Sequence, residues 1–166
     1  MRWPRADAGR VFRLDRLAGV LERLRRARPR PRVVLANGLF DLLHVGHVRY
    51  LRAARALGHF LVVAVNDDRS SRRLRGPGRP IVPAADRARI LSALEGVDAV
   101  VLFGGRTAEG VLRRLRPDLH CKGTDYAPGS VPERDVVRSY GGRVRIVGDA
   151  KRHASTGLIA RIGRRR

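Results

Sequence analysis

The sequence predicts an α/β fold with a mostly parallel sheet of five strands and helices on both faces. Short apolar runs alternate with helical patterns along most of the 166 residues, and this alternation is typical of a parallel sheet covered on both sides. Two of the runs, at 61–65 and 100–103, are almost continuously apolar. Strands of that composition are usually buried on both faces.

The expected elements follow in chain order. Residues 11–28 repeat apolar side chains at helical spacing and predict an amphipathic helix, which Pro29 and Pro31 end. Strand patterns occur at 32–36, 60–65, 98–103, 118–122 and 143–147. Helical patterns occur at 45–57, 67–74, 84–95, 107–116, 132–140 and 155–162. We therefore expect a basic lead-in over 1–31, one main domain over 32–162 and a basic tail over 163–166.

The net charge of +21 would by itself suggest a nucleic-acid partner. Lysine occurs only at Lys122 and Lys151, and the many arginines are spread along the chain, as a coding bias would produce. The one Trp, three Tyr and four Phe offer little material for stacking on bases. We expect nonspecific adhesion to nucleic acid and favour small polyphosphates as the functional partners.

The same composition bears on the compartment. No apolar run is long enough to cross a bilayer, and the N-terminal residues lack the apolar centre of a secretory signal. The single cysteine, Cys121, cannot form an intramolecular disulfide, which agrees with a reducing environment. We expect a cytoplasmic protein without a membrane partner.

The most informative motif is NGLFDLLHVGH at 37–47, directly after an apolar strand pattern. A strand that leads through a glycine-bearing loop into a helix brings backbone N–H groups and a positive dipole end to one point, where phosphate is stabilised. His44 and His47 share a face of the first helical turn, and Gly46 leaves room between them. The alternatives are a solvated helix face or a weak metal pair. The scattered positions of the other histidines and Cys121 argue against a metal site.

With further motifs in the same order, the chain resembles the nucleotidyltransferase superfamily with the HxGH signature. Within it, the likeness is to the adenylyltransferase domain of ADP-heptose synthases, which act on D-glycero-β-D-manno-heptose 1-phosphate. The matching stretches lie at 37–51, 63–83, 86–103, 116–126, 136–147 and 154–156. The chain departs from the pattern at Ala36, at 104–108, at Thr124 and at Ala154. These departures leave the phosphate chemistry intact and open the choice of acceptor.

The resemblance implies a Rossmann-like, doubly wound fold and transfer of AMP from ATP to a sugar phosphate, with pyrophosphate released. It also implies Mg²⁺ held mainly by the triphosphate, and a homodimer. The catalytic residues would be His44, His47 and Lys122. Nucleotide contacts would come from Asn37, Gly38, Phe40, Asp41, Gly46, Arg87, Ser155 and Thr156. Acceptor contacts would come from Asn66, Asp67, Arg72, Arg75, Asp125 and Tyr126.

Several of these residues also have simpler interpretations. In so Arg-rich a chain, Arg72 and Arg75 could merely face water. Hydroxyl and carboxylate groups such as those of Ser155 and Asp67 often serve only as helix caps.

Two other functions stay open. One is cytidylyl transfer to glycerol 3-phosphate or a similar alcohol phosphate. The other is a non-catalytic, basic module that binds nucleotides or nucleic acid.

Overall fold

The protein folds around one six-stranded sheet, seen here in a computed structural model that describes residues 9–127 and 129–148. The strands are β1 Val11–Phe12, β2 Val33–Gly38, β3 Phe60–Asn66, β4 Ala99–Phe103, β5 Leu119–Lys122 and β6 Arg143–Ile146. The helices of the described residues are α1 Leu14–Arg25, α2 Val45–Ala56, α3 Asp68–Arg75, α4 Ala84–Ala93, α5 Glu109–Leu115 and α6 Arg134–Ser139. The helix expected at 155–162 lies outside the described residues.

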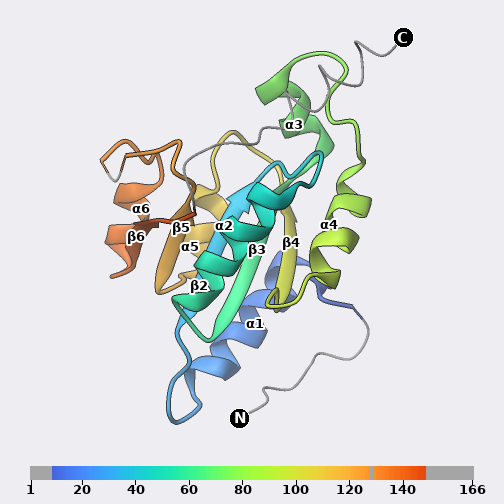
Figure 1. The fold of residues 1–166 in the computed structure, drawn as a ribbon. Coiled ribbons are helices and arrows are strands. Elements are labelled where there is room, and N and C mark those ends of the chain that lie inside the picture. Colours follow the sequence, from blue (N-terminus) through green and yellow to red (C-terminus); the bar gives the residue numbers. More distant parts are fainter. Residues whose placement is uncertain (1–8, 128, 149–166) are drawn as a thin grey trace.

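Every pair of neighbouring strands is parallel, in the order β1-β4-β3-β2-β5-β6. From β2, the chain winds first toward β3 and β4 and then returns to place β5 and β6 on the other side (Figure 1). The predicted doubly wound α/β architecture is therefore confirmed. The order of the strands reverses beside β2, and in such sheets ligands bind at the carboxyl ends of the strands at this point.

The sheet has six strands where the sequence predicts five. Val11 and Phe12 fall within the expected helix at 11–28, but they form the edge strand β1 and pair with Val100 and Val101 of β4. The helix begins only at Leu14 because the preceding residue is extended, with φ −72° and ψ 145°. Apolar residues at 11 and 14 match a helical spacing by coincidence, so periodicity alone placed the helix start too early.

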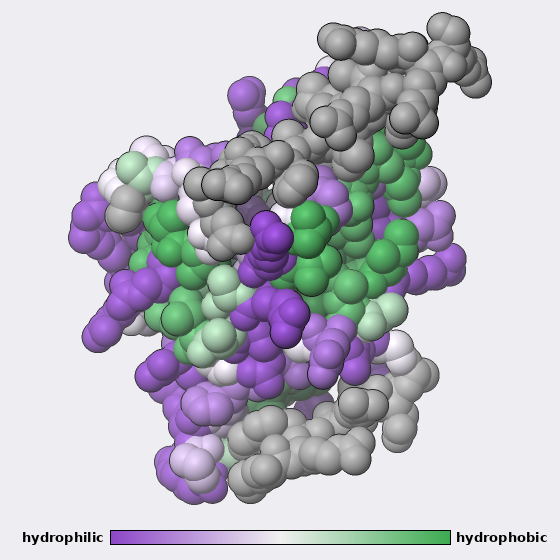
Figure 2. All heavy atoms as spheres, in the orientation of Figure 1, coloured by the Kyte–Doolittle hydropathy of each residue, from purple (hydrophilic) through white to green (hydrophobic). Residues whose placement is uncertain are grey.

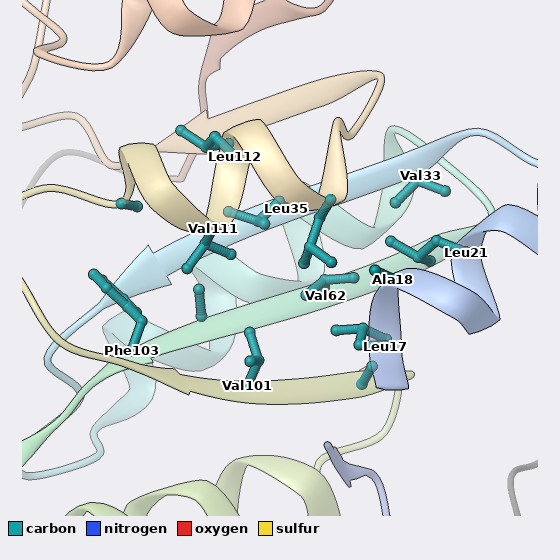
Figure 3. Packing of buried hydrophobic residues seen from close by; sticks show 14 of the residues in the cluster. Leu17, Ala18, Leu21, Val33, Leu35, Val62, Val101, Phe103, Val111 and Leu112 are labelled. Carbon is teal, nitrogen blue, oxygen red and sulfur yellow. The ribbon is translucent and has the colours of Figure 1, made fainter. Parts of the chain in front are cut away.

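Two apolar cores lie on opposite faces of the sheet. Alternate residues of β2 enter different cores: Val33 and Leu35 face one side, Val34 and Ala36 the other. Helices α1, α5 and α6 cover the first face, as Figure 3 shows for Leu17, Leu21 and Leu112 among others. Helices α2 and α4 cover the second face (Figure 1). Helix α1 thus shares its core with the strands.

The outer surface is uneven in polarity. Figure 2 shows hydrophobic residues gathered over α4. Ile90 in this helix is 48% exposed, and Ile81 in the segment before it is 49% exposed. None of the helices in the described part of the chain is both long enough and apolar enough to span a bilayer.

The packing of α1 predicts a large effect of shortening Leu21, which is fully buried. Leu21→Ala should lower the free energy of unfolding by about 2–5 kcal/mol, because it leaves a cavity in a closely packed core. Urea denaturation followed by circular dichroism measures this change. Ile90→Ala, on the exposed side of α4, is the matched control and should change stability by less than about 0.5 kcal/mol. Equal effects of the two substitutions would show that α1 is not part of the core.

Candidate active site

A cavity of about 460 Å³ opens where the carboxyl ends of β2, β3 and β5 meet. It is lined by the loop after β2 and the first turn of α2 on one side. The end of α3 and the segment after it, the loops after β4 and β5, the residues just before α6 and those just after β6 also line it. The site therefore lies at the edge of the sheet that the fold predicts.

The two histidines of the motif lie against each other at the start of α2. His44 is the N-cap residue, and His47 lies in the first turn. Their rings stack with centroids 3.9 Å apart, and both residues line the cavity together with Gly46. The backbone N–H of His44 donates to Nδ1 of His47 at 3.4 Å. In the neutral ring of His47 the proton is therefore on Nε2, which can donate to a ligand.

The loop before α2 supports His47 from the other side. Phe40 is buried and has a positive φ of 51°, and its ring meets that of His47 edge-on at 5.3 Å. Gly38 gives the Phe40 ring its room, because a Cβ there would lie 3.1 Å from the ring and push it aside. Both residues, which are predicted nucleotide contacts, line the cavity.

Lys122 lies at the end of β5 with its ammonium enclosed on several sides. The residue is only 6% exposed. Nζ lies 3.3 Å from Oδ1 of Asn37, 3.4 Å from Oε2 of Glu133 and 4.6 Å from the centre of the Tyr126 ring. Burial lowers the pKa of the Lys122 ammonium, and the Glu133 carboxylate opposes that shift.

Asn37 joins this lysine to a second buried group. Its Oδ1 accepts from Nε2 of His120 at 3.0 Å as well as from Lys122. Burial lowers the pKa of His120 to about 4, so the ring is neutral near pH 7. Because two donors occupy the amide oxygen, the amide nitrogen of Asn37 is directed away from them. Asn37 itself lines the cavity.

Asp41 fastens the segment after α3 across the cavity. Its carboxylate accepts from the Arg79 guanidinium and from the backbone N–H groups of Ile81 and Val82, at 2.7 and 3.0 Å. Burial raises the pKa of Asp41, but these hydrogen bonds outweigh it and leave the pKa below its ordinary value. Asp41 and Arg79 both line the cavity.

Arg87, an expected nucleotide contact, is not among the residues that line the cavity. It is 1% exposed and lies behind the cavity, where it donates to the backbone oxygens of Leu39, Asn66 and Val82. It also pairs with Asp68 at 2.7 Å. With these acceptors its guanidinium joins three loops, so its role in this structure is to hold the loops in place.

The expected acceptor residues divide into two groups. Asn66, Arg75, Asp125 and Tyr126 line the cavity, whereas Asp67 and Arg72 do not. Asp67 caps α3 by accepting from the backbone N–H of Ser70 at 2.7 Å, which is the simpler interpretation. Arg72 lies beside a separate, shallower hollow on α3.

Some expected residues lie outside the described part of the chain. Ser155 and Thr156 are in this group, so the structure leaves their predicted nucleotide contacts untested.

Sequence reasoning missed several residues of the site. The cavity is lined by the cations Arg49, Arg75, Arg79, Arg106 and Lys122, against the acids Asp41, Asp125 and Glu133. This excess of positive charge favours a polyanionic ligand. In a chain with 36 Lys and Arg residues, no local signal distinguishes the arginines of the site. For His120, the one signal in the sequence was its position inside the short strand LHCK.

The described residues contain no group of three or more His, Cys, Asp or Glu side chains placed to hold a metal ion. A Mg²⁺ ion that is carried by a triphosphate needs few protein ligands, because it keeps several waters and phosphate oxygens. The predicted Mg²⁺ stays a prediction.

Residues 35–156 match the family model described as cytidylyltransferase-like. The chain belongs to this family. The match covers the histidine motif, the ends of β2, β3 and β5, and all the strands from β3 to β6. All the residues that line the cavity therefore lie within the cytidylyltransferase-like domain.

Similar proteins agree with the resemblance drawn from the motifs. The bifunctional protein HldE of Syntrophotalea carbinolica is 49% identical over 130 residues, which are 78% of this chain and 26% of the relative. That of Geobacter metallireducens is 44% identical over 153 residues, 92% of this chain and 31% of the relative. The chain thus spans less than a third of the length of these relatives.

A solved structure is also similar. A lipopolysaccharide core biosynthesis protein from Thermoplasma volcanium is 29% identical, with a TM-score of 0.62 over 74% of this chain and 99% of that one. These findings confirm the predicted likeness.

The contacts of Asp41 predict a pH-dependent contribution to stability. Asp41→Asn should lower the free energy of unfolding at pH 7 by about 1–3 kcal/mol, because it weakens charge-assisted hydrogen bonds at a buried site. The folded-state pKa of Asp41 is lowered. Its contribution is therefore complete above the ordinary carboxyl pKa of about 4 and is lost as the pH falls through the folded pKa.

Urea titrations of both proteins at a series of pH values would measure this difference. Asp86→Asn, which removes an exposed i,i+3 pair with Arg89, is the matched control and should cost less than about 0.5 kcal/mol. A difference between wild type and Asp41→Asn that stays constant down to pH 3 would contradict the assignment.

Proposed function

We propose that this chain is a nucleotidyltransferase that transfers AMP from ATP to a sugar phosphate, with heptose 1-phosphate as the expected acceptor. The observation that carries the proposal is the stacked pair His44 and His47 at the start of α2, inside a cavity with an excess of cationic side chains. Membership of the cytidylyltransferase-like family and the likeness to the HldE proteins support it.

In this reaction a phosphate oxygen of the acceptor attacks the α-phosphorus of ATP in line. The new P–O bond forms as the bond to the β-phosphate breaks, and pyrophosphate leaves with that bonding pair. The protein needs no covalent nucleophile, because positioning and stabilisation of charge supply most of the catalysis. The groups around the α-phosphate are therefore the ones that matter.

His44 and His47 would donate to the α-phosphate oxygens as the phosphorus becomes five-coordinate. Nδ1 of His47 already accepts a backbone hydrogen bond, which directs the Nε2 proton to the ligand. The N-terminus of α2 adds partial positive charge at the same point. Both effects grow as negative charge develops on the phosphate.

Lys122 would stabilise the phosphates from the opposite wall of the cavity as a compact charge at the end of β5. The arginines of the lining, Arg49, Arg75, Arg79 and Arg106, are candidates for the remaining phosphate oxygens. Mg²⁺ held mainly by the triphosphate, when bound, would neutralise part of the phosphate charge. A homodimer, a cytoplasmic location and a place in ADP-heptose biosynthesis are further proposals from the sequence.

A pyrophosphate-release assay tests the proposal. ATP or CTP would be combined with heptose 1-phosphate or glycerol 3-phosphate, in the presence of Mg²⁺. Release with ATP and the heptose is the expected result. Release with CTP and the alcohol phosphate would instead support the cytidylyltransferase alternative. No release with any pair, together with salt-sensitive duplex binding, would favour a non-catalytic module.

His44→Ala and His47→Ala should each lower kcat by about 10²- to 10³-fold, because each removes a donor to the transition state. Arg113→Ala, on the exposed face of α5 and outside the cavity, is the control and should retain the wild-type rate. Thermal unfolding curves would check that each variant is folded. Undiminished turnover by the double histidine variant would overturn the proposed mechanism.

A further inference from the structure

Glu133 is a buried acid that no local sequence pattern marks as functional. It lies immediately before α6, is 2% exposed and lines the cavity beside Lys122. Burying a carboxylate is costly unless it is paired and hydrogen-bonded. Its partners therefore indicate what it does in the fold.

Both carboxylate oxygens of Glu133 contact the Lys122 ammonium, and one of them also accepts from the backbone. Oε1 accepts from the backbone N–H of Ala108, just before α5, at 3.1 Å. Nζ of Lys122 donates to the same Oε1 at 3.5 Å and lies 3.4 Å from Oε2. The backbone of Ala108 thus anchors the carboxylate, and both of its oxygens face the lysine.

Lys122 is held from three directions. Glu133 contacts its ammonium from the residue before α6, Asn37 from β2, and the Tyr126 ring from the loop after β5. A lysine has a flexible four-carbon stem, and its ammonium normally moves freely in water. Contacts from three separate segments instead fix the ammonium at one wall of the cavity.

We propose that Glu133 is a positioning residue, whose carboxylate fixes the Lys122 ammonium at the cavity wall as a charged donor for the phosphates. This role rests on the proposed function. Glu133 itself touches the lysine, and through the lysine it acts on the reacting phosphate.

The surrounding charges support this role. Burial favours the neutral amine of Lys122 and lowers its pKa, whereas Glu133 favours the ammonium. Burial also raises the pKa of Glu133, but Lys122 and the Ala108 hydrogen bond outweigh this and leave it lowered. Among the other titratable groups near the pair, His120 is neutral near pH 7, burial raises the pKa of the Tyr50 hydroxyl and keeps it neutral, and Tyr126 offers only its ring face. Glu133 is thus the one described anion next to Lys122 that these contacts identify.

Lysine is so rare in this chain that the proposal can be tested directly. Lys122 and Lys151 are the two lysines of the sequence, so a protein with ¹³C-labelled lysine side chains gives two Cε signals by NMR. Lys151→Arg assigns them. In Glu133→Gln, whose amide oxygen can still accept from Ala108, the titration midpoint of Lys122 should fall by about 1–3 pH units, because an opposite charge at this distance has been removed.

Glu109→Gln is the matched control, because it neutralises an exposed acid of α5. It should leave the Lys122 midpoint unchanged. Glu133→Asp keeps the charge at a longer distance, so the midpoint should fall by less than in Glu133→Gln. This second variant decides the question if Glu133→Gln does not fold. An unchanged Lys122 midpoint in the folded Glu133 variants would overturn the proposal.

The activity assay adds a measurement that would not change if Glu133 had a purely structural role. The alkaline limb of the pH profile of kcat/KM should shift to lower pH in Glu133→Gln. In a Lys122→Arg background the same substitution should cause no such shift, because arginine stays charged. A shift that persists in that background would contradict the role. If no substrate pair releases pyrophosphate, the proposed function fails, while the NMR titration still decides the contact between Glu133 and Lys122.

Discussion

Parallel pairing of β2 with both β3 and β5 is the constraint on which the site depends. Register places Gly38 beside Val65 and Ala36 beside Cys121, so three strands end close together. Strand pairing alone therefore brings together the polar residues at the ends of these apolar strands. The histidine pair, the Asn66 amide and the Lys122 ammonium come from three distant parts of the sequence and reach one cavity for this reason.

At this edge of the sheet, buried polar side chains hold the loops that follow the strands. Arg87 ties together the loops that begin after β2 and β3 by donating to their backbone oxygens. Asp41 fastens the segment after α3, and Glu133 links the lysine to the start of α5. Each of these groups is charged, and each has partners that offset the cost of burial. The cavity is therefore shaped by buried charged side chains that hydrogen-bond to the loops at this edge of the sheet.

The sequence allowed good prediction wherever the signal was local. His44 and His47 could be placed on one face because a spacing of three residues in a helix fixes their relation. Two arginines show the limit: Arg75 lines the cavity and Arg87 does not, yet nothing in their neighbours distinguishes them. Their exposure depends on which backbone oxygens come near, and this follows only from tertiary packing. Glu133 was missed for the same reason.

The two outer strands of the described sheet bear on how copies of this protein could associate. Strand β1 offers only two residues, and β6 exposes Arg143 and Arg145 along its length. Edge strands that are short or carry arginines resist pairing with a further strand, because they present few backbone groups or because like charges repel. Self-assembly by extending the sheet is disfavoured, so any symmetric pair would be expected to meet through helices.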